Sequence, residues 1–256
     1  MASGFRRQAD LPETWSLTPE AYFMSISENL ALIRDRIARA ARRVNRNPDD
    51  IQLMAVCKTM PVEAIREAYD AGQRLFGENR VQEFAGKWPQ LSTLSGAEWH
   101  MIGHLQSNKA RTAAELFSAV DSVDSIALGE KLNAAAGRAL PVLLELNIGG
   151  EESKSGMRPD SPALDELLNA AASWEHLEVR GLMAIPPFSD DPQSARPFFR
   201  VLKQYRDQIA ARNLPRIRMD VLSMGMSHDF EVAIEEGSTC VRVGTSIFGE
   251  RRRQNP

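Results

Sequence analysis

Apolar residues recur at helical spacing over the first long segment of the chain. Across residues 22–44 they return every three or four positions, and Thr18 and Pro19 just before them supply an N-cap and a first-turn proline. The other face of this segment is rich in arginine, which is typical of a solvated helix face, and Asn47-Pro48 ends it. The pattern predicts one long amphipathic helix over residues 18–46.

Beyond this helix, short apolar runs alternate with amphipathic segments. The runs of strand length are residues 52–57, 74–77, 98–102, 117–123, 140–148, 177–185, 217–222 and 239–243. The segments with helical spacing are residues 61–71, 79–88, 107–116, 125–138, 162–173, 192–212 and 227–236. Parallel strands need crossovers of this kind, so eight strands with intervening helices predict a closed (β/α)8 barrel of the TIM type; an open doubly wound sheet is the alternative.

The length fits a single domain of this architecture. A (β/α)8 barrel typically takes about 250 residues, so 256 residues leave no room for a second domain. We assign residues 1–17 to an N-terminal extension, residues 18–249 to the barrel and residues 250–256 to a basic C-terminal tail. Hydrophobic residues make up 43% of the chain, and the formal net charge is −3. These values indicate neither a nucleic-acid partner nor a membrane protein.

The two cysteines, Cys57 and Cys240, have no metal-ligand spacing and form no disulfide framework. Strand alternation places Cys57 on the opposite face from Lys58 and Cys240 on the same face as Arg242, so the thiols are not expected to pair. The N-terminus lacks the apolar core of a signal peptide. We therefore expect a cytoplasmic protein.

A lysine ends the first apolar run. The segment Leu53-Met54-Ala55-Val56-Cys57 predicts a buried strand that carries Lys58 at its C-terminal end, where barrels place their chemistry. Burying an ammonium group is costly unless the group is paired, loses its proton or reacts. Two interpretations follow: a reactive amine, or a lysine whose head reaches solvent from a strand end.

Two segments after the last two strands have the composition of phosphate-binding loops. Ser223-Met224-Gly225-Met226-Ser227 follows the seventh strand, and Gly244-Thr245-Ser246 follows the eighth. Glycine permits close backbone approach, and Ser227 is predicted to open a helix whose free amides favour an anion. A serine-capped turn is the alternative for either segment alone. Because the first and eighth strands are neighbours in a closed barrel, Lys58 and the phosphate site would share one mouth.

A cofactor with an aldehyde for Lys58 and a phosphate for the loops is pyridoxal 5'-phosphate (PLP). Arg242 lies inside the eighth strand, two residues before Gly244, and is expected to face the barrel interior. An arginine that meets the pyridine nitrogen disfavours its protonation and leaves the ring a poor electron sink. The alternative for Arg242 is an ion pair beneath the loop.

Several motifs, in order along the chain, resemble the YggS/PROSC family of pyridoxal phosphate homeostasis proteins. The resemblance spans residues 30–249, and its motifs are Val56-Cys57-Lys58-Thr59, Phe76-Gly77-Glu78-Asn79-Arg80-Val81-Gln82-Glu83, Trp99-His100-Met101-Ile102-Gly103-His104-Leu105-Gln106-Ser107-Asn108-Lys109, Gly181-Leu182-Met183-Ala184, Leu222-Ser223-Met224-Gly225-Met226-Ser227 and Val241-Arg242-Val243-Gly244-Thr245-Ser246-Ile247-Phe248-Gly249.

This resemblance implies the barrel of the alanine racemase N-terminal domain, which is fold type III among PLP proteins. It also implies cofactor-binding roles for Lys58 (Schiff base), Arg242 (pyridine nitrogen), Asn79 and Met226 (beside the ring), and Ser223, Ser227, Gly244 and Thr245 (phosphate). His104 stands where the family varies, and neither it nor His228 is assigned a role. The family holds and delivers PLP, with effects on amino-acid and keto-acid balance, so a monomeric carrier that serves PLP-dependent apo-enzymes is expected.

Whether the barrel catalyses a reaction is a separate question. Racemisation needs a base on each face of the cofactor, and Lys58 can serve only one. The tyrosines, Tyr22, Tyr69 and Tyr205, all fall in predicted helices rather than at strand ends. This favours a carrier over the alternatives, a weak amino-acid racemase or a barrel enzyme acting on a phosphorylated sugar.

Lys154 lies in the polar loop after the fifth strand and is predicted to reach the barrel mouth. There it would accept the cofactor transiently during release. A solvated loop lysine is the alternative interpretation.

Overall fold

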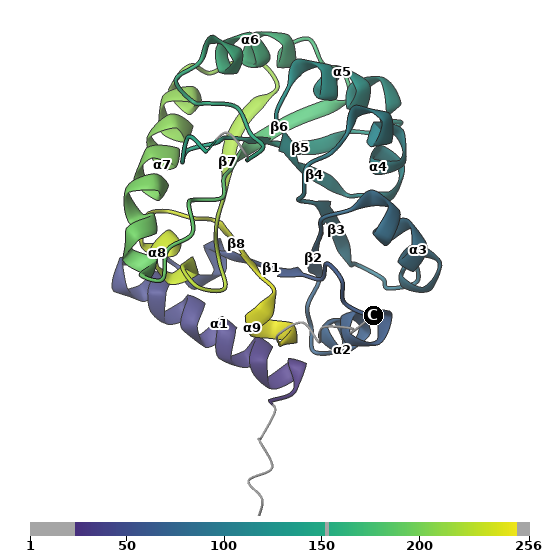
Figure 1. Cartoon of the computed structure of the whole chain (residues 1–256), viewed down its shortest axis with the longest axis vertical. Helices are drawn as coiled ribbons and strands as arrows, with labels where there is room; N and C mark the ends of the chain where they lie inside the picture. The colour runs from purple at the N-terminus through teal and green to yellow at the C-terminus, as the bar shows by residue number, and fades with distance from the viewer. Residues whose placement is uncertain (1–23, 152–153, 250–256) are drawn as a thin grey trace, which may run out of the picture.

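The structure of this chain is a computed structural model that describes residues 24–151 and 154–249. Within them, eight parallel strands close into a barrel in the order β1 to β8, and helices surround it (Figure 1). The predicted (β/α)8 barrel is confirmed, and the open sheet is excluded because β1 pairs with both β2 and β8. The proposed extension (1–17) and tail (250–256) lie outside the described residues.

The strands are β1 (Gln52–Val56), β2 (Leu75–Glu78), β3 (Glu98–Met101), β4 (Ala119–Val123), β5 (Leu140–Glu145), β6 (Leu177–Met183), β7 (Ile217–Met226) and β8 (Cys240–Val243). The helices are α1 (Ile26–Arg43), α2 (Val62–Asp70), α3 (Val81–Leu91), α4 (Ala110–Leu116), α5 (Ile126–Ala135), α6 (Pro162–Ala171), α7 (Arg196–Ala211), α8 (Phe230–Glu235) and α9 (Thr245–Phe248). Short 3-10 turns are η1 (Pro48–Asp50), η2 (Ser107–Lys109) and η3 (Pro192–Ala195).

The core has two layers, set by the alternation of side chains along each strand. A small cluster, which includes Met54, Val56 and Cys240, fills the barrel, and a larger one packs the strands against the helices. Cys57 belongs to the outer layer and Cys240 to the inner one, so the two thiols lie on opposite faces of the sheet. Both are buried and neither is in a disulfide, as predicted. Since Met54 and Val56 point inward, the same alternation turns Lys58 toward the barrel axis.

Helix α1 begins later than predicted. Its N-cap is Ser25 rather than Thr18, because Ser25 and Glu28 form a reciprocal capping box in which each side chain accepts a backbone N–H. The arginine face is also less solvated than expected. Arg36 and Arg43 form ion pairs with Glu231 of α8, which fastens α1 along the outside of the barrel (Figure 1).

The region after β7 also differs from the prediction. Strand β7 continues to Met226, through most of the predicted loop, and α8 begins at Phe230 with Asp229, not Ser227, as its N-cap. Gly225 has φ +92°, and a Cβ there would lie 2.5 Å from the Cβ of Ala233. Only glycine suits this position, where β7 turns into α8 over the barrel mouth.

None of the helices among the described residues is long and apolar enough to cross a membrane.

Candidate cofactor site

The C-terminal ends of the strands surround a cavity of about 450 Å³. Its wall includes most of the predicted site residues, namely Lys58, Asn79, Met226, Ser227, Arg242, Gly244 and Thr245. They come from the ends of β1, β2, β7 and β8. The structure therefore brings Lys58 and the segments at the ends of β7 and β8 to one cavity, as predicted.

Lys58 lies at the start of the turn that follows β1 and is half-buried. The next residue, Thr59, has φ +64°. This left-handed backbone is unfavourable for a β-branched residue, so the surroundings must hold the turn in place.

A partly buried ionic cluster holds this turn from both sides of Lys58. The Thr59 amide donates to Glu83 Oε1 at 2.6 Å, and Lys87 Nζ donates to the Cys57 carbonyl at 3.3 Å. Lys87 Nζ also lies 2.7 Å from Glu83 Oε1 and 2.8 Å from Glu78 Oε1. The first turns of α3 thus fix the backbone on either side of Lys58.

Burial and pairing set the charges in this cluster. Burial raises the pKa of Glu78, whose side chain is fully buried. Burial alone would lower the pKa of Lys87, but its hydrogen bonds to Glu78 and Glu83 raise it above the ordinary value. Lys87 therefore keeps its proton and serves as a structural cation, while Lys58 faces the cavity.

Arg242 faces the barrel interior, as predicted, and is 4% exposed. Its guanidinium donates to Ser223 Oγ at 2.7 Å and to the Ala184 carbonyl at 2.9 Å. Among the described residues it forms no ion pair, which disfavours the alternative interpretation. The cation is held by neutral acceptors and borders the cavity.

Ser223 is placed differently from its predicted role. It is fully buried inside β7, and its hydroxyl accepts the hydrogen bond from Arg242 rather than lining the cavity. The reason is the sheet register, which pairs Ser223 with Cys240 and puts it one layer below the mouth. Ser223 supports Arg242 from beneath the cavity, and its assignment to the phosphate stays a prediction.

The remaining phosphate candidates gather where β7 and β8 end. The Gly244 amide donates to Ser227 Oγ at 3.3 Å, which ties the two turns together. Asp229 accepts from the Met226 amide at 2.6 Å and shapes the turn between them. Thr245 begins α9, whose first amides have no acceptor within the helix. This cradle combines a hydroxyl and backbone N–H groups, the donor set that binds phosphate.

Asn79 follows β2 and lies against the loop after β3. A Cβ on Gly103 would come within 2.4 Å of the Asn79 carbonyl oxygen, so glycine is needed for these loops to touch. This close approach fixes Asn79 on the cavity wall beside Ile102.

The sequence did not single out Glu145, the last residue of β5, which also lines the cavity. It is 4% exposed, and its Oε1 accepts a hydrogen bond from Ser155 Oγ at 2.9 Å. The only signal in the sequence was a carboxylate inside an apolar run. Two histidines left without a role, His104 and His228, border the same cavity from exposed positions.

Lys154 does not line the cavity. Its ammonium pairs with the Glu151 carboxylate and donates to the Pro186 carbonyl at 3.2 Å. The neighbouring Ser155 does reach the wall. Lys154 is therefore paired with the loops beside the mouth and does not form part of the cavity wall.

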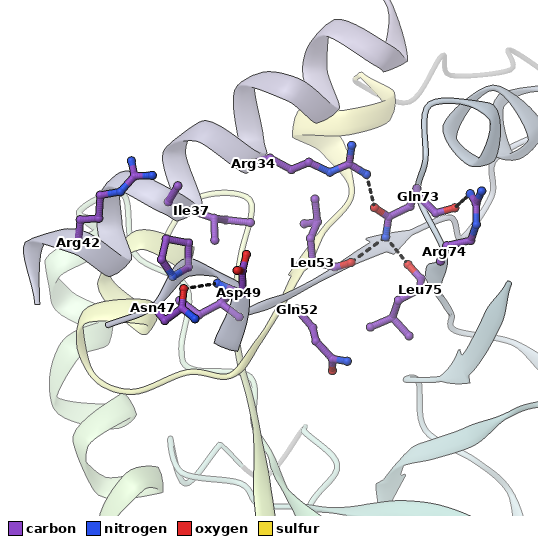
Figure 2. A pocket seen from close by; sticks show the side chains of 13 residues that line it. Arg34, Ile37, Arg42, Asn47, Asp49, Gln52, Leu53, Gln73, Arg74 and Leu75 are labelled. Carbon is purple, nitrogen blue, oxygen red and sulfur yellow. Dashed lines mark hydrogen bonds between the residues drawn. The ribbon is translucent and has the colours of Figure 1, made fainter. Parts of the chain in front are cut away.

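A larger cleft, of about 690 Å³, opens beside α1 at the other end of β1 and β2. Figure 2 shows Gln73 on its wall, where its amide donates to the Leu53 and Leu75 carbonyls at 2.7 Å each and Arg34 donates to its oxygen at 3.4 Å. No lysine lines this cleft. It therefore offers no amine for an aldehyde, and the smaller cavity is the candidate site.

The chain is similar to proteins of known sequence and structure over most of its length. Residues 29–252 match the family model described as "Alanine racemase, N-terminal domain". A relative from Escherichia coli strain K12, named pyridoxal phosphate homeostasis protein, is 46% identical over 231 residues, covering 88% of this chain and 97% of its own. A relative of the same name from Aquifex aeolicus is 41% identical over 232 residues, covering 90% of this chain and all of its own.

A solved structure with the same architecture is PipY of Synechococcus elongatus PCC7942, described with PLP bound. It is 38% identical, has a TM-score of 0.77, and the match covers 88% of this chain and 100% of PipY.

Proposed function

This chain belongs to the family of pyridoxal phosphate homeostasis proteins, built on the alanine racemase N-terminal domain, and on that premise we propose that it holds PLP at Lys58 and delivers it. It binds PLP and serves PLP homeostasis, as the names of its relatives and the PLP-bound structure of PipY support. The observation that carries the residue assignment is one cavity that joins Lys58 to the cradle of Ser227, Gly244 and Thr245.

The residues of this cavity fit the cofactor. When bound, PLP supplies an aldehyde that a lysine amine can hold as a Schiff base. Lys58 provides the amine, the cradle provides donors for the phosphate, and Asn79 and Met226 line the wall between them. Arg242 places a buried positive charge on the cavity wall, where Ser223 holds it.

A carrier role rather than catalysis is supported by what the described residues place around Lys58. Tyr69 and Tyr205 lie on α2 and α7, and the Tyr69 hydroxyl donates to the Ser95 carbonyl at 2.7 Å, outside the cavity. Tyr22 lies outside the described residues. A fixed cation beside the ring nitrogen would disfavour its protonation and so weaken the ring as an electron sink.

Adding PLP to the purified chain tests the binding assignment. We expect a yellow absorption band and a higher unfolding temperature, since a ligand that binds only the folded state stabilises it. Pyridoxal, which lacks the phosphate, should bind more weakly because it leaves the cradle empty. Equal affinity for the two compounds would contradict the assigned phosphate cradle.

Replacing Arg242 by methionine tests whether this arginine suppresses catalysis by the bound cofactor. The substitution removes the donor from the buried Ala184 carbonyl, so the free energy of unfolding should fall by about 1–3 kcal/mol. With the cation gone, proton exchange at the α-carbon of alanine in D2O should rise above the wild-type rate. Arg180→Met, on β6 and away from the cavity, is the matched control. Exchange at the wild-type rate in Arg242→Met would contradict this role.

Delivery to PLP-dependent apo-enzymes is the part of the function that involves Lys154. The ammonium would have to leave Glu151 and Pro186 to reach the mouth, so its role as a relay requires a rotation of the side chain. Lys154→Ala should slow cofactor transfer to an apo-enzyme while leaving equilibrium PLP binding unchanged. Transfer at the wild-type rate would refute the relay.

A further inference from the structure

Glu145 faces Lys58 across the cavity. It ends β5, which is four strands from β1 in either direction around the closed barrel (Figure 1). Lys58 follows β1, and both residues line the same cavity. The cavity therefore has an amine on one wall and a carboxyl group on the opposite wall.

The two oxygens of this carboxyl group differ. Oε1 accepts a hydrogen bond from Ser155 Oγ at 2.9 Å, whereas Oε2 is buried and finds no hydrogen-bond partner among the described residues. Buried polar atoms are nearly always paired, so an unpaired one needs an explanation. Because Glu145 is on the cavity wall, a molecule in the cavity can supply the missing partner.

Charged groups from several elements surround Glu145. Burial raises its pKa above the ordinary value, and the Asp124 carboxylate after β4 raises it further. The Ser155 hydrogen bond, Arg242 of β8 and His104 after β3 lower it but do not cancel the burial effect. Its register partner on β6, Met183, does not titrate, and Lys58 approaches from the far wall.

We propose that Glu145 is a further cofactor-binding residue, and that its protonated form retains PLP whereas its ionised form releases it. This inference rests on the proposed function. A neutral carboxyl group can donate its proton to a polar atom of the cofactor through Oε2. The ionised group instead adds a negative charge to a cavity that must hold an anionic phosphate ester. The proton exchanges with solvent, so binding is linked to pH.

The test is the dissociation constant for PLP from acidic to neutral pH, measured by absorbance for the wild type and Glu145→Gln. Glutamine keeps the shape of the side chain and a donor but cannot ionise. The affinity of the wild type should weaken relative to Glu145→Gln by up to about tenfold for each pH unit above the pKa of Glu145. Glu98→Gln, the same change at the opposite end of the barrel, should follow the wild type.

Parallel curves for the wild type and Glu145→Gln would overturn the inference and leave the proposed function intact. No PLP binding by any of these proteins at any pH would overturn the proposed function itself. A measurement without cofactor is also decisive. The carboxyl carbon of Glu145, followed by NMR in the unloaded chain, should titrate above the ordinary glutamate pKa of about 4.3. An ordinary value would contradict the inference even if the glutamine variant failed to fold.

Discussion

Lys58→Ala is expected to lose completely the absorption band of the lysine–PLP Schiff base, which lies at longer wavelength than the band of free PLP. Alanine has no amine for the aldehyde, and no other lysine lines the cavity among the described residues. The cradle of Ser227, Gly244 and Thr245 remains, so the variant should still bind PLP through its phosphate. Its affinity should fall by more than about tenfold, or about 1.4 kcal/mol. Absorbance and equilibrium dialysis measure the two effects separately.

The fold of this variant should be intact, because Lys58 is half-buried in a turn whose backbone is held by other residues. Lys131→Ala, which removes an exposed lysine from α5, is the matched control and should keep the full band. A yellow band of undiminished intensity in Lys58→Ala would show that another amine holds the cofactor.

The second large effect is expected for Lys87→Met. This substitution removes the cation from a partly buried cluster and leaves the fully buried Glu78 without its ionic partner. Removing one member of a buried ion pair typically costs about 3–5 kcal/mol. Lys58 should also lose its fixed position, since Lys87 and Glu83 hold the backbone on either side of it. Slower attachment of PLP should therefore accompany the loss of stability.

The pH dependence of this loss follows from Glu78. Burial already raises the pKa of Glu78, and removing Lys87 should raise it further. An acid with a raised pKa in the folded state stabilises the fold below its unfolded pKa and loses that contribution as pH rises through the folded value. The deficit of Lys87→Met in chemical denaturation should grow from acidic to neutral pH. Lys131→Met is the control, and an equal deficit at all pH values would refute the charge assignment.

Much of this site could be predicted from the sequence because charges stood out in apolar strands. Lys58 ends one apolar run and Arg242 interrupts another, and the structure brings both to one cavity. Glu145 carried the same kind of signal, but its run was interpreted only as a strand. The barrel itself followed from eight runs separated by helical segments, since that pattern depends only on local periodicity.

What could not be predicted depends on contacts between distant parts of the chain. The role of Ser223 follows from the register between β7 and β8, which places it under Arg242. The clamp on Lys58 comes from α3, more than twenty positions away along the chain. Helix α8 begins three residues after Ser227, with Asp229 at the N-cap position, because β7 continues to Met226.

The most direct test of the central claim is borohydride reduction of the PLP-loaded wild-type chain, followed by mass mapping of its peptides. Reduction makes the bond between lysine and cofactor permanent, so the modified peptide identifies the amine. Attachment at Lys58 predicts one modified peptide, which contains residues 56–59 and carries the mass of reduced PLP. A modification confined to another lysine, such as Lys154, or no modification in a protein that binds PLP, would contradict it.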